Sequence, residues 1–390
     1  MSGKKRGYLG ASCVCGNCQG DARFVSRRSR AVVCLFGDVR VTRPYYHCAV
    51  CHAGESPWDQ ELGLTNRFLT PAVAELATLA GTMESFARAA DVNLRKMTGV
   101  RISESTVERT TEDAGRRLGE LLRQRVKFGE DRQWDWQRDA QGRTCAYASL
   151  DATGVRRQGA GGARLEGRMA YVASIYNPQS EYDQCRRDAH QVRYLAGFYD
   201  LDELGLQLRR QAGQVGWDEA EQQIGLSDGG SGMESFLHRN FPLAEIIIDF
   251  WHAKEHLLEL AQAVFSDEEE RKRWMDKTCH KLKHEGGAAV HDQLEAMKPE
   301  IEAKTLELHR QTVGYFANHR HKMDYPRYVA NGWQIGSGPI ESACRTVVGD
   351  RLKGSGMRWG DDGADALCHI RALSRSELDQ WDEFWRVHRN

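Results

Sequence analysis

The chain has 390 residues, which at about 150 residues per domain predicts two or three domains. Its 54 Lys and Arg residues are balanced by 55 Asp and Glu residues, which excludes a strongly basic or strongly acidic protein, and a 41% hydrophobic share suffices for ordinary cores. Apolar stretches such as Leu257–Phe265 fall far short of the roughly 20 residues that span a bilayer, and the basic N-terminus lacks the apolar segment of a signal peptide. We therefore expect a soluble, cytoplasmic protein with no membrane contact.

Positive charge is concentrated near the N-terminus. Residues 1–46 have a local excess of seven positive charges, nine cations against two acids, in a chain whose net charge is −1. The nine cations are Lys4, Lys5, Arg6, Arg23, Arg27, Arg28, Arg30, Arg40 and Arg43. Such a cluster is typical of a surface that binds nucleic acid. The alternative is a merely soluble, mobile end, against which the ordered-domain signals of the same stretch argue.

Two C-x-x-C motifs enclose a predicted hairpin in the same region. Cys15 and Cys18 form the first motif, and Cys48 and Cys51 form the second. Between them, two apolar, β-branched segments flank Gly37-Asp38, a sequence typical of a hairpin turn. Because tetrahedral Zn²⁺ takes four thiolates and so small a core needs a metal, this pattern predicts a zinc ribbon over residues 1–60.

The remaining cysteines leave alternatives open. The chain has 11 cysteines, and an odd count in a cytosolic protein argues against a disulfide framework. Cys13 is two residues before Cys15 and is the rival for its place in the first motif. Cys34 lies inside a predicted strand, where we expect it in the core. A set of free thiols with no metal is the alternative to the zinc site.

A helical region is predicted over residues 61–132, after a loop at residues 57–64. Thr70-Pro71 is a cap followed by proline at the first helical position. Further apolar segments run over 86–94 and from Ser103 onward. Three short helices predict a helix-turn-helix, in which Arg101 and Arg109 would lie near phosphate. A plain helical linker domain is equally compatible with this periodicity.

The middle of the chain alternates between strand and helix patterns. We expect strands at residues 145–151, 168–176, 192–199, 223–227 and 244–250, and helices at 201–214 and 232–240. Three strands, a helix, a strand, a helix and a strand make an α/β pattern. This order matches a ribonuclease-H-like core, whose first part would occupy residues 140–256.

This assignment of the strands identifies two aspartates as candidate metal ligands. Asp151 is expected at the end of the first strand and Asp228 at the end of the fourth. The first and fourth strands are neighbours in a ribonuclease-H-like sheet, and ligands bind outside such strand ends. Two aspartates placed there are suited to Mg²⁺ or Mn²⁺, and a pair of such ions activates an attacking oxygen and stabilises a leaving one. A strand-end turn for Asp151 and an Asx turn for Asp228 are the structural alternatives.

Glu341 is the candidate for a third carboxylate. It lies in the first turn of a predicted helix that Gly338-Pro339 begins, and a helix N-terminal acid favoured by the macrodipole is the alternative interpretation. Downstream basic residues, among which we expect Arg345, Arg351 and Lys353 to hold phosphates, favour the catalytic interpretation.

A helical segment separates these carboxylates. Residues 257–331 have helical character and many charges, which predicts an all-helical insertion in the core, with a separate helical domain as the alternative. Residues 332–375 would then complete the core with the helix that carries Glu341, and residues 376–390 would form a C-terminal tail.

With these motifs assembled, the chain resembles DDE transposases of bacterial insertion sequences, specifically the Kra-type group related to the Mutator superfamily. The resemblance covers nearly the whole chain. Beyond the two C-x-x-C motifs it rests on Arg43–Tyr46, Leu150–Val155, Ser227–Gly229, Phe241–Ala244, Asp249–Leu257, Gly336–Arg345 and Arg351–Trp359. The last two segments are the most specific.

The resemblance implies a ribonuclease-H-like catalytic domain with a helical insertion, and Asp151, Asp228 and Glu341 as the metal-binding triad. Such proteins also carry a Cys or Asp followed three residues later by His. Here these are Asp249 and His252, which we interpret as supporting the site, with Asp249 as the rival to Asp228. The extra Cys13 is a departure from the family pattern.

The implied activity is metal-dependent cleavage of DNA and strand transfer at the ends of an insertion sequence. Double-stranded DNA would be the partner, contacted in the N-terminal region by Arg30, Arg40 and Arg43, and joining two ends would need at least a dimer on bacterial DNA. A DNA-binding regulator derived from a transposase and an endonuclease that cuts without joining are the alternatives. A small-molecule α/β enzyme lacks support because no nucleotide-binding motif is present, and Gly159–Gly167 is only a weak phosphate-loop candidate.

Overall fold

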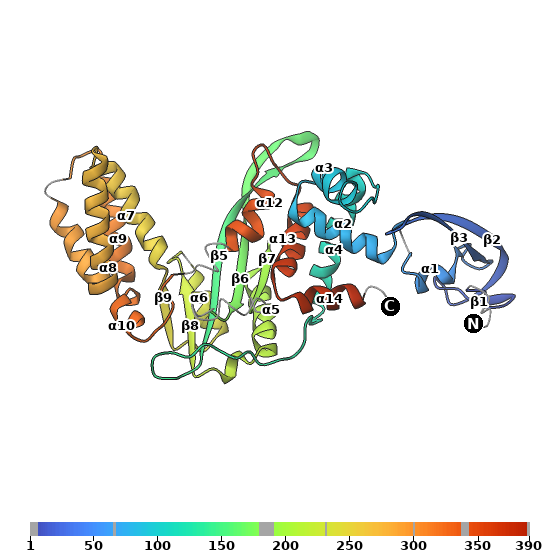
Figure 1. Cartoon of the computed structure of the whole chain (residues 1–390), viewed down its shortest axis with the longest axis horizontal. Coiled ribbons are helices and arrows are strands. Elements are labelled where there is room, and N and C mark those ends of the chain that lie inside the picture. The colour runs from blue at the N-terminus through green and yellow to red at the C-terminus, as the bar shows by residue number, and fades with distance from the viewer. Residues whose placement is uncertain are drawn as a thin grey trace. The chain divides into compact units, whose positions relative to one another are not determined.

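The computed structural model describes residues 7–64, 68–178, 191–230, 232–298, 301–336 and 343–387 of a mixed α/β protein. The chain divides into two compact units (Figure 1). Unit 1 comprises Met1–Glu120 and Leu378–Asn390, and unit 2 comprises Leu121–Glu377. Within the described parts, no helix is both long and apolar enough to cross a membrane.

Unit 1 begins with a four-stranded antiparallel sheet. Its strands β1 (Ser12–Val14), β2 (Asp21–Cys34), β3 (Gly37–Cys48) and β4 (Gly54–Glu55) lie side by side in chain order. The turn between β2 and β3 was expected at Gly37-Asp38, but Cys34 pairs with Gly37 and the turn residues are Leu35 and Phe36. Gly37 has φ 103°, so the glycine closes the turn as the first residue of β3.

Helices follow the sheet within the same unit. Pro57–Glu61 is a short helix, α1, where a loop was expected. Helix α2 (Pro71–Met83) begins at the predicted proline, α3 (Phe86–Arg88) continues as the π-helical turn η1 (Ala89–Leu94), and α4 spans Glu104–Arg123. The hydroxyl of Ser103 accepts a hydrogen bond from the Thr106 amide, as a helix cap does.

The C-terminal segment is a helix rather than the expected tail. Helix α14 spans Leu378–Val387. Trp381, Phe384 and Trp385 recur at helical spacing and are buried, and the Trp381 indole donates a hydrogen bond to Glu75 of α2 over 3.2 Å. This aromatic face packs α14 into unit 1 and explains why the segment is ordered.

Unit 2 is built on a five-stranded mixed sheet (Figure 1). Its strands are β5 (Cys145–Gln158), β6 (Arg164–Tyr176), β7 (Val192–Gly197), β8 (Gln222–Ser227) and β9 (Glu245–Ile248), arranged in the order β7-β6-β5-β8-β9. Strand β6 runs antiparallel to both β5 and β7, whereas β8 runs parallel to β5 and β9 runs parallel to β8. The predicted number and chain order of the strands are confirmed.

Strand β5 is longer than expected. The sequence placed its end at Asp151, but pairing with β6 continues to Gln158. Only the pairing with β8 stops near Asp151, at Ser149 opposite Leu226. The two outer segments of β5 and β6 form a hairpin arm that extends past β8, and Asp151 lies where the buried part of β5 gives way to this arm.

Helices cover the sheet and hold its ends. Helices α5 (Leu201–Gln214) and α6 (Met233–Asn240) match their predicted ranges to within one residue. Helix α13 (Asp361–Arg375) packs against β7, and the π-helical segment η7 (Cys344–Gly349), which continues as α12 (Asp350–Leu352), packs against β5 and β6.

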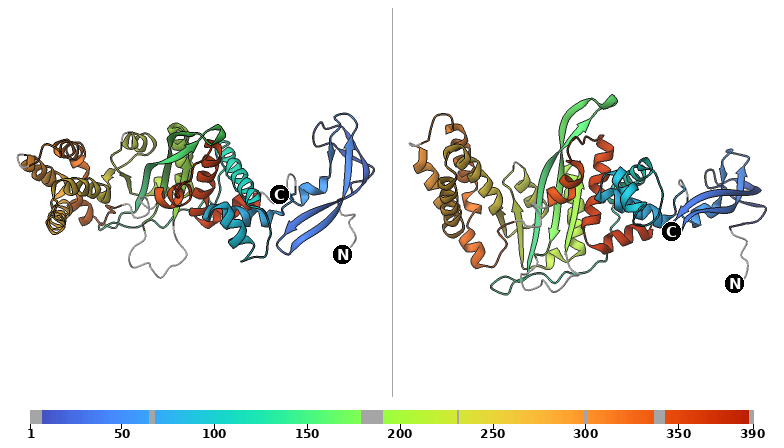
Figure 2. Two further views of the ribbon diagram at one scale, coloured as in Figure 1. Left: turned by 90° about the horizontal axis from the view of Figure 1, so that it is seen from above. Right: turned by 45° about the horizontal axis from the view of Figure 1, so that its top comes forward.

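A helical segment lies between β9 and η7 in the chain (Figure 2). It consists of α7 (Phe250–Val264), α8 (Glu268–Met297), α9 (Leu306–His319), the turn η6 (Arg320–Lys322) and α10 (Tyr325–Ala330). Helix α8 bends at Gly286, where φ is 85°, and a side chain on Gly287 would overlap Met323. The bend therefore lets α8 pack closely against the turn that follows α9.

A buried ion pair fixes the outer edge of the unit 2 sheet. Arg193 of β7 has 1% of its side chain exposed, and its Nε donates to the Glu377 carboxylate over 2.8 Å. Its other guanidinium nitrogens donate to the Gln214 side chain over 3.0 Å and to the Glu130 carbonyl over 3.3 Å. All three guanidinium nitrogens of Arg193 therefore have a hydrogen-bond acceptor, as a buried charge requires.

Glu377→Leu should lower the free energy of unfolding of unit 2 by about 3 kcal/mol, because it leaves the Arg193 charge buried without its carboxylate. The double variant Arg193→Met/Glu377→Leu should lose less, because neither charge remains. Urea denaturation followed by tryptophan fluorescence measures both. A single variant as stable as wild type would contradict this role, and Glu307→Gln, which breaks an exposed ion pair with Arg310, is the control expected to change little.

Candidate functional site

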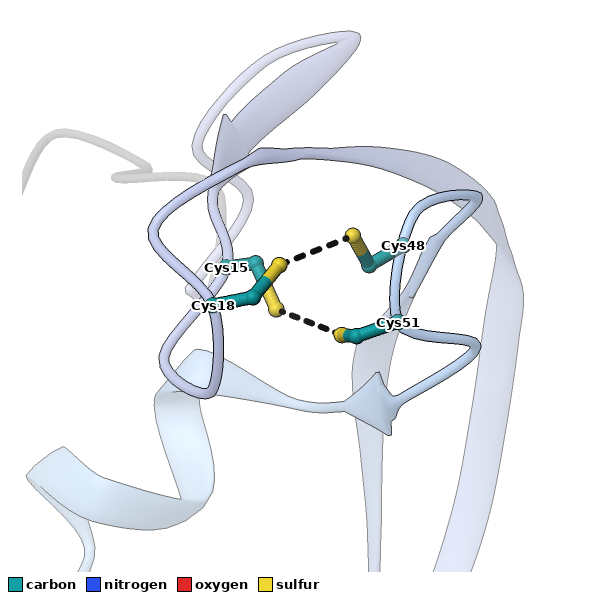
Figure 3. A group of neighbouring side chains, drawn as sticks. All are labelled: Cys15, Cys18, Cys48 and Cys51. Atoms are coloured by element: carbon teal, nitrogen blue, oxygen red, sulfur yellow. Dashed lines mark hydrogen bonds between the residues drawn. The ribbon is translucent and has the colours of Figure 1, made fainter.

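Four cysteines from two distant segments meet in unit 1 (Figure 3). Cys15 and Cys18 flank the turn after β1, and Cys48 and Cys51 flank the turn after β3. Their sulfur atoms all lie within 4.8 Å of one another. Cys15 and Cys48 are buried, Cys51 is partly buried and Cys18 is exposed.

The spacing of these sulfurs fits one metal ion. The Cys15–Cys51 and Cys18–Cys48 sulfur pairs are each 3.6 Å apart, well beyond the roughly 2.05 Å of a disulfide. Four sulfurs at about 2.3 Å from a tetrahedral Zn²⁺ lie about 3.8 Å from one another. The four predicted ligands are therefore close enough to hold a metal ion, and their arrangement is compatible with a structural zinc.

Hydrogen bonding affects the cysteines of the cluster unequally: the pKa of Cys51 is lowered, whereas the pKa of Cys18 is raised to about 12. Hydrogen bonds from the Asn17 side chain and the Ala53 backbone lower the pKa of Cys51 to about 6. The Asn17 amide donates to the Cys15 sulfur over 3.4 Å. Cys13 lies in β1 opposite Ala22 and packs against the small core beside the cluster, but it is not one of the four grouped cysteines.

The basic residues of this sheet fall into two groups. Arg30 and Arg43 both bind the carboxylate of Asp59 in α1, over 3.2 and 2.6 Å. These two guanidinium groups therefore hold α1 against the sheet, a role the sequence did not reveal. Arg40 is exposed, as are Arg101 and Arg109 in the helical part of the unit.

In unit 2, the register of two parallel strands brings Asp151 and Asp228 together. Ser149 lies opposite Leu226, so two residues further along each chain the same register puts Asp151 beside Asp228. Asp151 is partly buried and accepts hydrogen bonds from the Ala152 amide over 2.6 Å and from the Cys344 side chain. Burial raises the pKa of Asp151, and the negative charge of Asp228 raises it further.

Asp228 sits in a tight loop directly after β8. The Gly230 amide donates to Asp228 Oδ1 over 2.7 Å, and the Gly229 amide donates to the Ser227 hydroxyl over 3.1 Å. Gly229 has φ 84°, and a Cβ on Gly230 would come within 2.9 Å of Asp228 Oδ1. Two glycines are needed here because the backbone turns back under the carboxylate.

Asp249 occupies a different position, at the N-terminus of α7. It is buried, and its Oδ1 accepts hydrogen bonds from the amides of Trp251 over 2.6 Å and His252 over 3.2 Å. Asp249 therefore caps the helix that carries His252. His252 is partly exposed, with Nδ1 3.4 Å from the Glu255 carboxylate.

Asp151 and His252 line one open pocket of about 660 Å³, whereas Asp228 and Asp249 are not among its lining residues. The pocket is lined by Asp151, Thr153, His252, Glu255, Cys344, Arg345, Gly349 and Lys353. Its walls come from β5, α7, η7 and the segment after α12, so elements on both sides of the helical segment in the chain meet at the pocket. The lining includes two carboxylates, one thiol and three basic side chains, a mixture suited to a charged substrate. These are Asp151, Glu255, Cys344, His252, Arg345 and Lys353.

Glu341 lies outside the described residues, as does the rest of 337–342. The residues before and after that segment are held near the pocket. The Ile335 carbonyl accepts a hydrogen bond from the Phe250 amide at the start of α7 over 2.9 Å. On the other side, Cys344 hydrogen-bonds to Asp151 and lines the pocket.

The three basic residues predicted downstream of Glu341 differ in their surroundings. Arg345 is exposed at the pocket, with 82% of its side chain accessible. Lys353 also lines the pocket and donates to the Thr153 hydroxyl of β5 over 2.8 Å. Arg351 is 2% exposed and stacks on Trp359, with its guanidinium carbon 5.1 Å from the ring centre. This burial argues against the predicted phosphate contact by Arg351.

An aromatic cluster that the sequence analysis missed holds the Asp228 loop. The Tyr315 hydroxyl of α9 donates to the Asp228 carbonyl over 3.1 Å. The Tyr315 ring lies between His256 of α7 and His319 of α9, at centroid distances of 4.0 and 5.0 Å. Burial raises the pKa of Tyr315, so its hydroxyl stays a donor. The i,i+4 spacings of His252 with His256 and of Tyr315 with His319 were the available signal.

The first turn of α6 is tied to the same cluster. Glu234 of α6 pairs with Lys322 of η6 and lies 3.5 Å from His319 Nδ1. Burial lowers the pKa of His256 and of His319, which favours neutral rings beside Tyr315. The helices after β9 therefore contact the chain on both sides of the Asp228 loop. Tyr315 binds the Asp228 carbonyl, and Lys322 and His319 contact Glu234 in the first turn of α6.

Comparison of the sequence with family models and with curated proteins finds no match. The residues of this chain therefore carry the evidence for its function. Among the described residues, the four cysteines are the one group of three or more whose ligand atoms are close enough for a metal ion.

Purified protein should contain one zinc ion per chain, and Cys48→Ser should lose it, because three thiolates bind Zn²⁺ more weakly than four. Elemental analysis by plasma emission measures the metal. Cys13→Ser is the matched control and should keep full zinc content, because Cys13 is outside the cluster. Equal zinc loss in both variants, or none in either, would contradict the ligand set.

Proposed function

We propose that this protein is a DDE-type DNA transposase that binds the ends of an insertion sequence and cleaves and joins DNA strands. The observation that carries the proposal is the closeness of Asp151, which lines a charged pocket, to Asp228, which follows the neighbouring parallel strand and acts electrostatically on Asp151. The chemistry is the one implied by the resemblance to DDE transposases, and the pocket is the site where we propose that it takes place.

The sheet supports a ribonuclease-H-like core. Three antiparallel strands followed by two parallel strands, in the order β7-β6-β5-β8-β9, is the arrangement that the proposal requires. In it the first and fourth strands of the core are neighbours, so carboxylates at their ends share one site. The helices α7–α10 then correspond to the insertion, which follows the fifth strand.

The donor set fits a divalent metal. Asp151 and Asp228 offer hard carboxylate oxygens, and burial together with the charge of Asp228 disfavours the charged form of Asp151, which a nearby cation would reverse. Glu341, between the anchored residues Ile335 and Cys344, would be the third ligand. A pair of Mg²⁺ or Mn²⁺ ions held there would lower the pKa of the attacking oxygen and offset charge on the phosphorus.

The proposed reaction needs no covalent protein intermediate. In cleavage, a water oxygen attacks the phosphorus at the element end, the bond to the 3′ oxygen breaks, and that oxygen takes up a proton. In transfer, the freed 3′-hydroxyl attacks a phosphorus in target DNA and releases the target 3′ oxygen. Arg345 and Lys353 at the pocket would bind the phosphates on either side of the reacting one.

The N-terminal unit would recognise the element ends. Its sheet carries exposed arginines at positions 23, 27, 28 and 40, and contacts of this kind position a protein on the DNA backbone. A zinc ion in the four-cysteine cluster would keep this small sheet rigid. Since two ends must be joined, we propose that the active form on DNA is at least a dimer.

Asp151→Asn and Asp228→Asn should each abolish Mg²⁺-dependent cleavage of a plasmid that carries the DNA flanking this gene, while leaving end binding intact. Asp249→Asn should retain cleavage and stability, because an asparagine Oδ1 can still accept the α7 cap hydrogen bonds. Gel analysis of the plasmid and a gel-shift assay measure cleavage and binding.

The three variants separate the candidate ligands and functions. Full loss of cleavage in Asp249→Asn with normal activity in Asp228→Asn would transfer the ligand role to Asp249. Specific binding without cleavage by the wild type would favour a regulator, and cleavage without joined products would favour an endonuclease.

Tyr315→Phe should lower the cleavage rate about fivefold without changing DNA affinity, because the loss of one hydrogen bond of about 1 kcal/mol loosens the Asp228 loop. Single-turnover cleavage at increasing Mn²⁺ measures this, and we expect a higher Mn²⁺ requirement. Arg310→Ala on the exposed side of the same helix α9 is the control. Unchanged rate and Mn²⁺ requirement in Tyr315→Phe would refute the positioning role.

A further inference from the structure

Helix α8 carries a concentration of positive charge that the proposed active site does not use. Residues 271–284 contain six Lys or Arg residues and one acid, in a chain whose net charge is −1. The six cations are Arg271, Lys272, Arg273, Lys277, Lys281 and Lys283. Three of the seven acids of this helix lie in its first turn, three lie beyond residue 284, and within 271–284 the one acid is Asp276.

Four of the basic side chains form one stripe. Arg273, Lys277, His280 and His284 follow one another at intervals of four, three and four residues, and all four are exposed. At 100° per residue these positions fall within a narrow arc of the helix, about 16 Å long. The rings of His280 and His284 lie 4.3 Å apart, so they point along the same face.

The stripe faces away from the protein interior. The buried residues of this part of α8 are Met275, Thr278 and Leu282, which lie on the opposite side of the helix. Among the described residues, no ion pair involves Arg273 or Lys277. The Arg273 Nε instead donates to the Glu269 carbonyl over 3.3 Å, which orders its stem and leaves its charge uncompensated.

Lys254 connects this surface to the pocket. It lies on α7, two residues after His252 of the pocket lining, with its ammonium 4.8 Å from the centre of the Trp251 ring. Its positive charge also acts on the thiol of Cys279, one residue before His280 on α8. Positive charge therefore continues from the edge of the pocket across α7 to the stripe.

We propose that the α8 stripe (Arg273, Lys277, His280 and His284) binds the phosphate backbone of duplex DNA that extends from the pocket. The inference rests on the proposed function for the identity of the substrate and adds a second contact to it. A length of about 16 Å covers about five base pairs at 3.4 Å per phosphate of one strand. The two imidazoles add hydrogen-bond donors between the flanking charges.

The test is the salt dependence of DNA binding by the full chain. A fluorescent DNA duplex of arbitrary sequence is titrated at increasing NaCl, and log Kd is plotted against log [NaCl]. Arg273→Ala/Lys277→Ala should reduce the slope by about 1.8, because each lost phosphate contact removes about 0.9. Alanine favours helix, so α8 should stay folded, which circular dichroism verifies.

Two further variants make the result specific. Lys304→Ala/Arg310→Ala removes the same charge from exposed positions outside the stripe and should leave the slope unchanged. Arg273→Lys/Lys277→Arg keeps the charges and should restore the wild-type slope. An unchanged slope in the stripe variant, or an equal reduction in the Lys304/Arg310 variant, would overturn the proposal.

The binding assay does not depend on catalysis, so the two proposals can fail separately. A reduced slope in a protein that never cleaves DNA would keep the α8 contact and reject the transposase. Cleavage with an unchanged slope in the stripe variant would keep the transposase and reject the α8 contact.

Discussion

The parallel pairing of β5 with β8 is the constraint on which the rest of unit 2 depends. It brings the carboxylates of Asp151 and Asp228 near each other, where burial and the charge of Asp228 both disfavour the charged form of Asp151. A fold does not keep such a pair without a compensating use, because like charges at one edge of a sheet cost stability. A shared cation reverses that cost, and this is the physical basis of the proposed function.

Much of the surrounding structure serves to hold these two carboxylates still. Asp151 is fixed by hydrogen bonds from the Ala152 amide and the Cys344 side chain. Asp228 is fixed by the Gly230 amide below and, through its carbonyl, by Tyr315 from α9. The helices α7–α10 are therefore mechanically connected to the site. An insertion of this kind, in the proposed transposase, would transmit DNA contacts on its surface to the carboxylates.

The sequence predicted those parts of the structure that depend on local patterns. The strand order in unit 2 was predictable because each strand is an apolar run bounded by turn residues, and α2 was predictable from Thr70-Pro71. The four-cysteine cluster was predictable because two C-x-x-C loops can satisfy one tetrahedral ion. Asp151 and Asp228 could be predicted to lie near each other because each comes at or just after the point where two neighbouring parallel strands stop pairing.

The features that the sequence did not reveal depend on tertiary contacts. Arg351 was expected at phosphate, but it stacks on Trp359, and Arg30 and Arg43 are bound by Asp59. Strand β5 was cut short because its outer part pairs only with β6. Tyr315 lies 87 residues from the carbonyl it holds. No local pattern specifies such contacts, and the one made by Tyr315 forms only when α9 packs near the Asp228 loop.

The central claim is that Asp151 and Asp228 together hold a divalent cation, and metal binding tests it most directly. Electron paramagnetic resonance can count the Mn²⁺ ions bound by the zinc-loaded full chain, for the wild type and for Asp151→Asn, Asp228→Asn and Asp249→Asn. The account predicts Mn²⁺ binding by the wild type and by Asp249→Asn, and its loss in both of the other variants. Equal Mn²⁺ binding by all four proteins would contradict it.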